Sequence, residues 1–321
     1  MKNKHFIFII CVLLLFLIIA FSVFFNKKNI NQNYDVHLLF NTDRNYKEFT
    51  KIAIKSAIVN KKPDSIYHIN VLCVEMQREE CNEFKSLESE NAEIKITMKN
   101  FSDISNIKNY EISHYVTRTD LFKFIFSEIF DESKILYIDS DTLILGDLRD
   151  LYNTDISDKF LAAVLKMEPE SYYPKRYYFN CGVMLLNLDK FRDSGISEIL
   201  ISAKNHDMQR DYQTQRVFNE FIPLSKIKKL SPVYNDIDRW NDEYKKKYNY
   251  LKTYFPYSLR YPTIKELDKH AVIIHYAGAQ KPWIKNTEAE KYVKEYIEYA
   301  KMVNSKFQPL NIDYESKKGK I

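Results

Sequence analysis

The strongest constraint on the fold is a regular alternation of short apolar runs with segments of helical periodicity. The runs of strand length are residues 36–40, 68–74, 94–98, 134–138, 160–165, 182–188 and 272–276. The segments with apolar residues at helical spacing are 46–59, a charged stretch that ends at Glu90, 119–130, 196–206, 211–221 and 287–301. Strands that alternate with helices favour an α/β fold with a mostly parallel, doubly wound sheet. We place this domain at residues 35–301.

The apolar run at residues 134–138 ends in two carboxylates, Asp139 and Asp141. In an open α/β sheet, ligands bind outside the carboxyl ends of the strands. Carboxylate oxygens suit Mg²⁺ or Mn²⁺, and these ions in turn suit a diphosphate. A second Asp-x-Asp pair, Asp236 and Asp238, follows no strand and is interpreted as loop. The context of the first pair therefore predicts a cation site.

The N-terminal region contains a long apolar stretch. Residues 6–25 are apolar throughout except for Ser22, and about 20 such residues span a bilayer as a helix. The stretch exceeds the apolar core of a signal peptide, so we expect an uncleaved transmembrane signal-anchor, with a cleaved signal as the alternative. Residues 1–5 form a flank, 26–34 a short stem and 302–321 a basic polar tail.

Lysines flank the apolar stretch on both sides, so the charge distribution leaves its orientation open. A single span implies a single-pass membrane protein whose domain lies on one side. In a eukaryote this would be a type II protein facing the Golgi or ER lumen, and in a bacterium the domain would lie at the cytoplasmic face. Cys73 and Cys81 either pair in an oxidising lumen or remain buried free thiols.

Composition excludes several classes of protein. The chain has five glycines in 321 residues, and neither a Gly-x-Gly-x-x-Gly loop nor a Gly-x-x-x-x-Gly-Lys loop occurs, which argues against the commonest nucleotide-binding folds. The net charge of +5 is spread over scattered basic residues and no nucleic-acid motif is present, so we expect no nucleic-acid partner. The absence of a Cys-x-x-Cys motif argues against zinc and iron–sulfur sites.

Two further segments carry residues suited to a ligand site. Asn180 and Gly182 introduce an apolar run, where a glycine lets the backbone approach a ligand closely; a buried strand after a turn gives the same pattern. His275 ends the last predicted strand, and Gly278 and Lys281 follow it. A neutral imidazole can complete a carboxylate-rich Mn²⁺ site, and a lysine can contact phosphate as a point charge. Taken alone, this pair also fits a structural histidine and a surface lysine.

Together the three segments resemble glycosyltransferase family 8, whose members are retaining transferases. The resemblance covers roughly residues 35–285 and rests on Asp-Ser-Asp at 139–141, Phe-Asn-Cys-Gly-Val-Met-Leu-Leu-Asn-Leu at 179–188 and His-Tyr-Ala-Gly-Ala-Gln-Lys-Pro-Trp at 275–283. It implies a GT-A fold, a single Rossmann-like domain with a mostly parallel mixed sheet. It also implies transfer of a hexose or pentose from a UDP-sugar to a glycan, glycoprotein or glycolipid hydroxyl, with Mn²⁺ or Mg²⁺ as cofactor, and it allows a homodimer.

The resemblance also implies roles by position. Asp139, Asp141 and His275 match the metal ligands of the family. The positions that would contact the uridine, diphosphate and sugar of the donor are Asn41, Thr42, Asp43, Tyr46, Lys123, Asn180, Cys181, Gly182, Gly278 and Lys281. Arg118 is an alternative to Lys123.

One catalytic candidate follows from the same resemblance. Gln215 matches the glutamine that lies beneath the reacting sugar, and Gln213 with Asp211 is the alternative alignment. The residues on either side of Gln215 depart from the family pattern, and Lys166 falls near a position that is often acidic and touches the sugar. These departures leave the donor sugar open. The alternatives are a catalytically inactive binding or assembly subunit and another metal-dependent phosphate enzyme. We assign no catalytic nucleophile or base.

Overall fold

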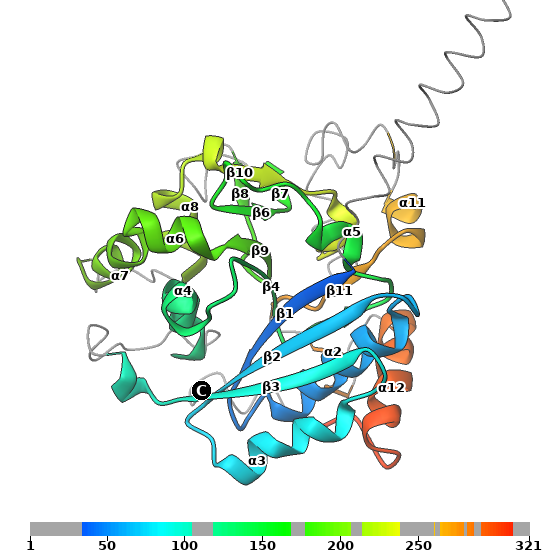
Figure 1. The fold of residues 1–321 in the computed structure, drawn as a ribbon. Coiled ribbons are helices and arrows are strands. Elements are labelled where there is room, and N and C mark those ends of the chain that lie inside the picture. Colours follow the sequence, from blue (N-terminus) through cyan, green and yellow to red (C-terminus); the bar gives the residue numbers. More distant parts are fainter. Residues whose placement is uncertain are drawn as a thin grey trace, which may run out of the picture. The chain divides into compact units, whose positions relative to one another are not determined.

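A seven-stranded sheet, in the order β10-β6-β9-β4-β1-β2-β3, forms the centre of the molecule (Figure 1). The structure is a computed structural model that describes residues 34–104, 118–167, 177–206, 214–237, 260, 264–278, 281–285 and 290–310. The strands of the sheet are β1 (Asp35–Thr42), β2 (Ile66–Val74), β3 (Ala92–Lys99), β4 (Lys134–Ile138), β6 (Leu161–Ala163), β9 (Val183–Asn187) and β10 (Ile227–Lys229). Strands β3, β2, β1 and β4 are parallel, whereas β9 runs antiparallel to β4 and β6. The predicted mixed, mostly parallel sheet is confirmed.

Two small sheets complete the strand pairing. Strand β5 (Thr142–Ile144) pairs antiparallel with β11 (Ile273–His275), and β7 (Leu165–Met167) pairs antiparallel with β8 (Tyr177–Phe179). The strand predicted at residues 272–276 therefore forms, but it joins β5 instead of the central sheet. Since β5 starts directly after the Asp-Ser-Asp motif, this pairing carries β11 to the carboxyl end of β4. Sequence analysis missed β5, because three residues are too few to show a strand period.

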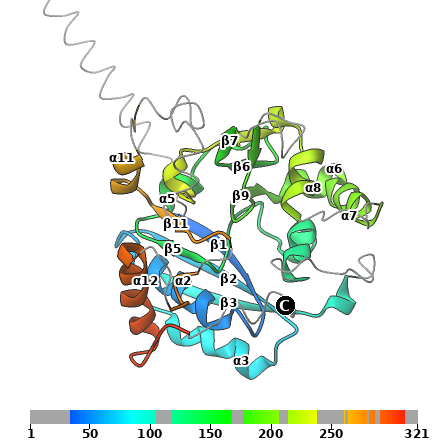
Figure 2. The ribbon, with the colours of Figure 1, turned by 180° about the vertical axis from the view of Figure 1, so that it is seen from behind.

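Helices cover both faces of the sheet (Figures 1 and 2). The α-helices are α2 (Lys47–Asn60), α3 (Arg78–Asn82), α4 (Phe126–Ile129), α5 (Arg149–Tyr152), α6 (Leu188–Ser194), α7 (Ile196–His206), α8 (Thr214–Phe221), α11 (Ile264–Lys269) and α12 (Glu290–Val303). The 3-10 helices are η1 (Glu83–Leu87), η2 (Phe101–Asp103), η3 (Arg118–Ile125), η4 (Leu224–Lys226) and η5 (Pro232–Tyr234). The helix predicted at residues 119–130 is thus a 3-10 helix followed by one α-helical turn.

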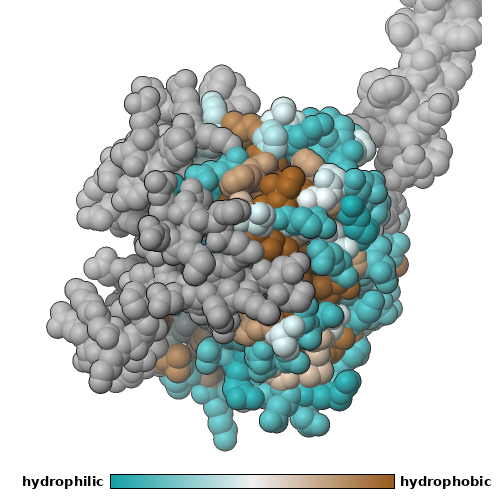
Figure 3. All heavy atoms as spheres, turned by 90° about the vertical axis from the view of Figure 1, so that its left-hand side faces the viewer, coloured by the Kyte–Doolittle hydropathy of each residue, from teal (hydrophilic) through white to brown (hydrophobic). Residues whose placement is uncertain are grey.

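Alternate residues of the central strands belong to two hydrophobic layers, as the two-residue period of a strand requires. Leu38 and Leu136 pack with α2 and α5 in one layer. Leu39 and Ile135 pack with η3, α6, α7 and α8 in the other. A third cluster lies between α2 and α12 and includes Trp283. On the face seen in Figure 3, apolar side chains form a band with polar side chains to its right and below it.

The structure describes the first part of the predicted C-terminal tail but not the predicted membrane anchor. No helix among the described residues is long and apolar enough to cross a membrane. The anchor predicted at residues 6–25 lies outside the described residues, as do 1–5 and most of the stem. At the other end, the Leu310 N–H donates to the Trp283 carbonyl at 2.7 Å, and the Lys285 N–H donates to the Leu310 carbonyl at 2.9 Å. The first part of the predicted tail therefore lies along residues 281–285.

Candidate active site

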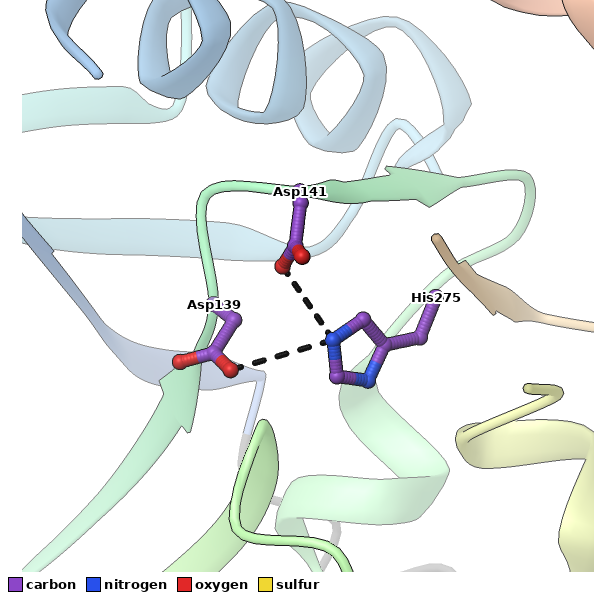
Figure 4. Close-up of side chains that lie close together, drawn as sticks. All are labelled: Asp139, Asp141 and His275. Atoms are coloured by element: carbon purple, nitrogen blue, oxygen red, sulfur yellow. Dashed lines mark ion pairs between the residues drawn. The ribbon is translucent and has the colours of Figure 1, made fainter. Parts of the chain in front are cut away.

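Asp139, Asp141 and His275 converge at the carboxyl end of β4 (Figure 4). One ligand atom from each lies within 4.8 Å of the other two. Nε2 of His275 is 3.1 Å from Oδ1 of Asp141 and 3.8 Å from Oδ2 of Asp139. Asp139 and Asp141 lie in the turn between β4 and β5. The pairing of β5 with β11 places His275 beside them, opposite Thr142. The structure thus brings together the three predicted metal ligands.

Each carboxylate turns one oxygen toward His275 and the other toward a donor of the protein. Oδ1 of Asp139 accepts hydrogen bonds from the Tyr137 hydroxyl and from Nζ of Lys123, the latter at 3.1 Å. Oδ2 of Asp141 accepts a hydrogen bond from Nζ of Lys281. The two inner oxygens and the imidazole nitrogen are left facing one another. Three such acceptors require a cation or a proton between them, and their hard oxygen and imidazole character fits Mn²⁺ or Mg²⁺.

Charged neighbours shift the pKa values of Asp141 and Lys123. Burial alone would raise the pKa of Asp141, but the Lys281 ammonium and His275 outweigh it and hold that pKa well below its usual range. Burial would lower the pKa of Lys123, but Asp120 and Asp139 raise it well above its ordinary value. Both carboxylate ligands are therefore flanked by lysines, and the buried Lys123 stays charged at neutral pH.

Asp120 is a component of the site that sequence analysis missed. Its Oδ1 lies 3.0 Å from Nζ of Lys123, which in turn contacts Asp139. Burial raises the pKa of Asp120, and Lys123 opposes that rise. A single acid in a helical stretch carries no signal in the sequence, because only the fold shows that Lys123 bridges two carboxylates.

Gly182 lies against the ligand cluster with no space for a side chain. A Cβ there would be 2.2 Å from Cε1 of His275 and 2.6 Å from Oδ2 of Asp139. Its carbonyl accepts a hydrogen bond from the Asp139 N–H at 2.7 Å. The backbone at Gly182 therefore lies against two of the candidate metal ligands, and its predicted approach to a bound donor stays a prediction.

Gln215 is held next to this glycine from the first turn of α8. Its Oε1 accepts hydrogen bonds from Nδ2 of Asn180 at 2.9 Å and from the Cys181 N–H at 3.3 Å. Asn235, which sequence analysis did not single out, is fully buried beside His275, and its Oδ1 lies 3.0 Å from Nδ1 of that imidazole. The alternative candidates Gln213 and Asp211 lie outside the described residues.

The loop after β1 adjoins the Asp-Ser-Asp motif. Ser140, the middle residue of that motif, donates to the Asn41 carbonyl at 3.1 Å, and Thr50 Oγ1 joins Ser140 to Thr42 at 2.7 and 2.8 Å. Nδ2 of Asn41 donates to the Thr119 carbonyl at 2.8 Å, at the start of η3. The predicted uridine-side loop is therefore tied to the candidate metal ligands by hydrogen bonds.

The rest of this loop meets the C-terminal segment. Oδ1 of Asp43 accepts hydrogen bonds from the Asn45 and Tyr46 N–H groups and so shapes the turn into α2. The ring of Tyr46 packs edge-on against Trp283, with centroids 6.2 Å apart. Trp283 follows Lys281 on the same segment, so the loop at 41–46 and the lysine share one edge of the site.

Three remaining predicted positions have different surroundings. Gly278 has a φ of +96°, a left-handed conformation that favours glycine, with nothing near a Cβ. Lys166 is buried in β7, opposite Tyr178. The side chain of Arg118, the alternative to Lys123, is not among the described ones.

The α/β domain, with an Asp-x-Asp pair at the end of a central strand, has the fold of the GT-A glycosyltransferases. Residues 37–287 match the sequence profile described as "Glycosyl transferase family 8", and the chain belongs to this family, a family of retaining, nucleotide-sugar-dependent transferases.

The chain is also similar to curated proteins and to a solved structure, which shows the same fold. The chain is 26% identical to General stress protein A of Bacillus subtilis, over 58% of this chain and 66% of that protein. It is 22% identical to Lipopolysaccharide 1,2-glucosyltransferase of Escherichia coli, over 81% of this chain and 76% of that protein. It spans 40% of the length of Glycosyltransferase GlyF of Streptococcus pneumoniae. The crystal structure of galactosyltransferase LgtC with donor and acceptor sugar analogs covers 88% of this chain and 99% of its own, with 22% identity and a TM-score of 0.65.

Proposed function

We propose that the protein is a retaining glycosyltransferase that transfers a hexose or pentose from a UDP-sugar to a hydroxyl of a glycan or glycoconjugate. The observation that carries the proposal is the convergence of three acceptor atoms on one point, from Asp139, Asp141 and His275. Family membership and the names of the relatives, a lipopolysaccharide glucosyltransferase among them, support the reaction class.

The residues around this point suit departure of a diphosphate. Mn²⁺ or Mg²⁺ held by the three ligands would neutralise negative charge on the leaving diphosphate. Lys281 lies at the same edge, where its ammonium can turn from Asp141 to a phosphate oxygen. Lys123 keeps Asp139 oriented and adds positive charge. These fixed charges act at the point where the leaving group becomes more anionic.

A covalent intermediate on a carboxylate is not part of the proposal. Retaining hydrolases use a nucleophilic carboxylate about 5 Å from an acid. Asp120 is bound to Lys123, and both other nearby carboxylates face His275. We therefore favour attack of the acceptor hydroxyl on the same face as the departing UDP, with a UDP oxygen as the base.

We further propose that residues 6–25 anchor the enzyme in a membrane. The support is the apolar length of this segment, in which Ser22 is the one exception and which suits one bilayer span. The catalytic domain would then face the Golgi or ER lumen of a eukaryote, or lie at the cytoplasmic face of a bacterial membrane. Protease protection of the domain in sealed vesicles, compared with a chain that lacks residues 1–30, tests this proposal.

UDP release tests the catalytic proposal. The full chain in detergent is incubated with Mn²⁺ and a panel of UDP-sugars in the presence and absence of EDTA. We expect release from one donor, loss of release on chelation, and a fall of about 10²–10³-fold in Asp141→Asn, because the metal would lose a charged ligand. Asp158→Asn is the matched control, since Asp158 is exposed and, within the part of the chain that the structure describes, forms its ion pair with the neighbouring Lys159.

Two outcomes would contradict the proposal. Binding of UDP without turnover of any donor would favour an inactive binding or assembly subunit. Phosphate release from nucleotides that have no sugar linked to their terminal phosphate, with no sugar transfer, would favour another metal-dependent phosphate enzyme.

A further inference from the structure

A chain of side-chain amides connects the candidate metal ligand His275 with Gln215. Nδ1 of His275 is 3.0 Å from Oδ1 of Asn235. Nδ2 of Asn235 donates to Oδ1 of Asn180 at 3.2 Å, and Nδ2 of Asn180 donates to Oε1 of Gln215 at 2.9 Å. The four residues come from β11, the segment after η5, the turn before β9, and α8. Four elements far apart in the sequence therefore share one hydrogen-bond chain.

Two backbone N–H groups determine which atom of each amide in this hydrogen-bond chain is the oxygen. The Gly182 N–H donates to Asn180 at 2.9 Å, and the Cys181 N–H donates to Gln215 at 3.3 Å. A backbone N–H can only donate, so each side-chain atom that it meets must be a carbonyl oxygen. The oxygen and nitrogen positions of an amide are otherwise interchangeable. Here the backbone removes that ambiguity for Asn180 and Gln215.

The direction extends to Asn235 and then to His275. Because the oxygen of Asn180 faces Asn235, the amino group of Asn235 must point to it. The oxygen of Asn235 then faces His275, and Nδ1 of the imidazole must carry a proton in order to donate. In the neutral imidazole, Nε2 then carries the lone pair and faces the inner oxygens of Asp139 and Asp141, where a cation would lie. This is the tautomer that binds a metal through Nε2.

The other end of the chain determines what Gln215 offers to the site. Its oxygen already accepts two hydrogen bonds, from Asn180 and Cys181. Among the described residues its Nε2 amino group donates to none. In this arrangement Gln215 presents a hydrogen-bond donor, not a nucleophilic oxygen.

We propose that Asn235 is a positioning residue that fixes His275 in its Nδ1–H tautomer, and that Asn180 extends the same chain to turn the amino group of Gln215 toward the donor sugar. The part about Gln215 rests on the proposed function, whereas the part about His275 requires only metal binding. The two parts can be tested separately, because a substitution can remove the hydrogen bond on either side of Asn180.

Three variants of the full chain test the proposal. Asn235→Leu removes the acceptor for His275, and we expect the Kd for Mn²⁺ to rise by about 10–100-fold, the usual range for such outer partners of a ligand. Asn235→Asp keeps that acceptor and loses the donor to Asn180, so the Kd should stay within about threefold of wild type. Asn180→Asp keeps the acceptor for Asn235 and loses the donor to Gln215, so Mn²⁺ affinity should hold while kcat falls. Calorimetry gives the Kd, and circular dichroism checks that each variant folds.

The tautomer of His275 gives a readout that a merely structural role would not change. In metal-free protein with ¹⁵N-labelled histidine, at a pH at which imidazoles are neutral, long-range ¹H–¹⁵N spectra should show an Nδ1–H tautomer for His275 in wild type, Asn235→Asp and Asn180→Asp. The signal is assigned by its loss in His275→Gln. In Asn235→Leu we expect a mixture of tautomers. If Asn235→Leu fails to fold, Asn235→Ala replaces it with the same expectation.

The results separate the two proposals. Wild-type Mn²⁺ affinity and an unchanged tautomer in folded Asn235→Leu would overturn the positioning role of Asn235. An unchanged kcat in Asn180→Asp would overturn the role assigned to Gln215. If no UDP-sugar is turned over but affinity and tautomer behave as expected, the proposed function fails and the inference about Asn235 stands.

Discussion

Gly182 shows how one missing side chain maintains the candidate metal site. Its α-carbon is so close to His275 and Asp139 that a methyl group would overlap atoms of both side chains. Neither neighbour can move freely, because Asp139 is hydrogen-bonded to Tyr137 and Lys123, and His275 to Asn235. The space that glycine leaves is therefore occupied by the candidate ligands themselves.

We expect Gly182→Ala to lower Mn²⁺ affinity by about 10–100-fold, because the added methyl group forces His275 or Asp139 out of position. Isothermal calorimetry with Mn²⁺ on the folded variant measures the change. Gly146→Ala is the matched control, since its Cβ would meet Val272 at 3.5 Å, an ordinary contact. An Mn²⁺ Kd equal to wild type in Gly182→Ala would mean that the imidazole does not need its present position.

At the same scale, sequence reasoning found residues inside contiguous motifs and missed isolated ones. Gly182 and His275 lie within recognisable segments, so their types and spacing were informative. Asn235 and Asp120 act through contacts with residues remote in sequence, and an asparagine or aspartate in a polar stretch has no distinctive pattern. Only the folded chain shows that Asn235 lies beside His275 and that Lys123 separates Asp120 from Asp139.

At the scale of elements, α8 is joined to β8 by one asparagine. Oδ1 of Asn219 accepts from the Phe179 N–H, and its Nδ2 donates to the Phe179 and Gln215 carbonyls, each at 2.8 Å. Because β8 is a short strand and α8 only two turns long, these bonds fix the position of the helix. Gln215 in the first turn therefore depends on Asn219 one turn later.

Asn219→Ala should lower the free energy of unfolding by about 1–3 kcal/mol, because the buried backbone groups of Phe179 lose their partner. Urea denaturation followed by circular dichroism measures this loss, and kcat should fall as Gln215 loses its fixed position. Asn82→Ala serves as the control, since Asn82 is exposed and its side chain caps no helix. A variant as stable as wild type would show that packing alone holds α8.

The central strands were predictable because each is a continuous apolar run between turn-like residues, whereas β5, β7, β8 and β10 were not. Each of these strands is three residues long, and its place depends on the partner strand. Periodicity predicted the helix at residues 119–130 but not that most of it is 3-10, because both kinds of helix share this apolar spacing. The β5–β11 pair, which brings His275 to the aspartates, was therefore beyond sequence reasoning.

At the scale of the whole molecule, the candidate site joins segments from most of the domain. The loop after β1, the end of β4 and the residues after β11 meet around Asp139 and Asp141, and hydrogen bonds through Ser140 and Lys281 hold them together. A ligand that contacts all of these segments binds only the folded state. Its binding free energy must therefore add to the stability of the domain.

We expect Mn²⁺ and UDP together to stabilise the protein by about 2.7 kcal/mol when the ligand is at a hundred times its Kd. For a domain of this size that corresponds to a rise in Tm of about 5–10 °C. Differential scanning calorimetry with EDTA, Mn²⁺, UDP and both ligands measures the effect. UDP with EDTA should give a much smaller rise, because the diphosphate then meets Asp139 and Asp141 with no metal ion between the negative charges. In Asp141→Asn the rise in Tm with Mn²⁺ and UDP together should no longer exceed the sum of the rises with each ligand alone. An equal rise with UDP in EDTA would mean that the nucleotide binds without the metal, and that Lys123 and Lys281 alone hold the diphosphate.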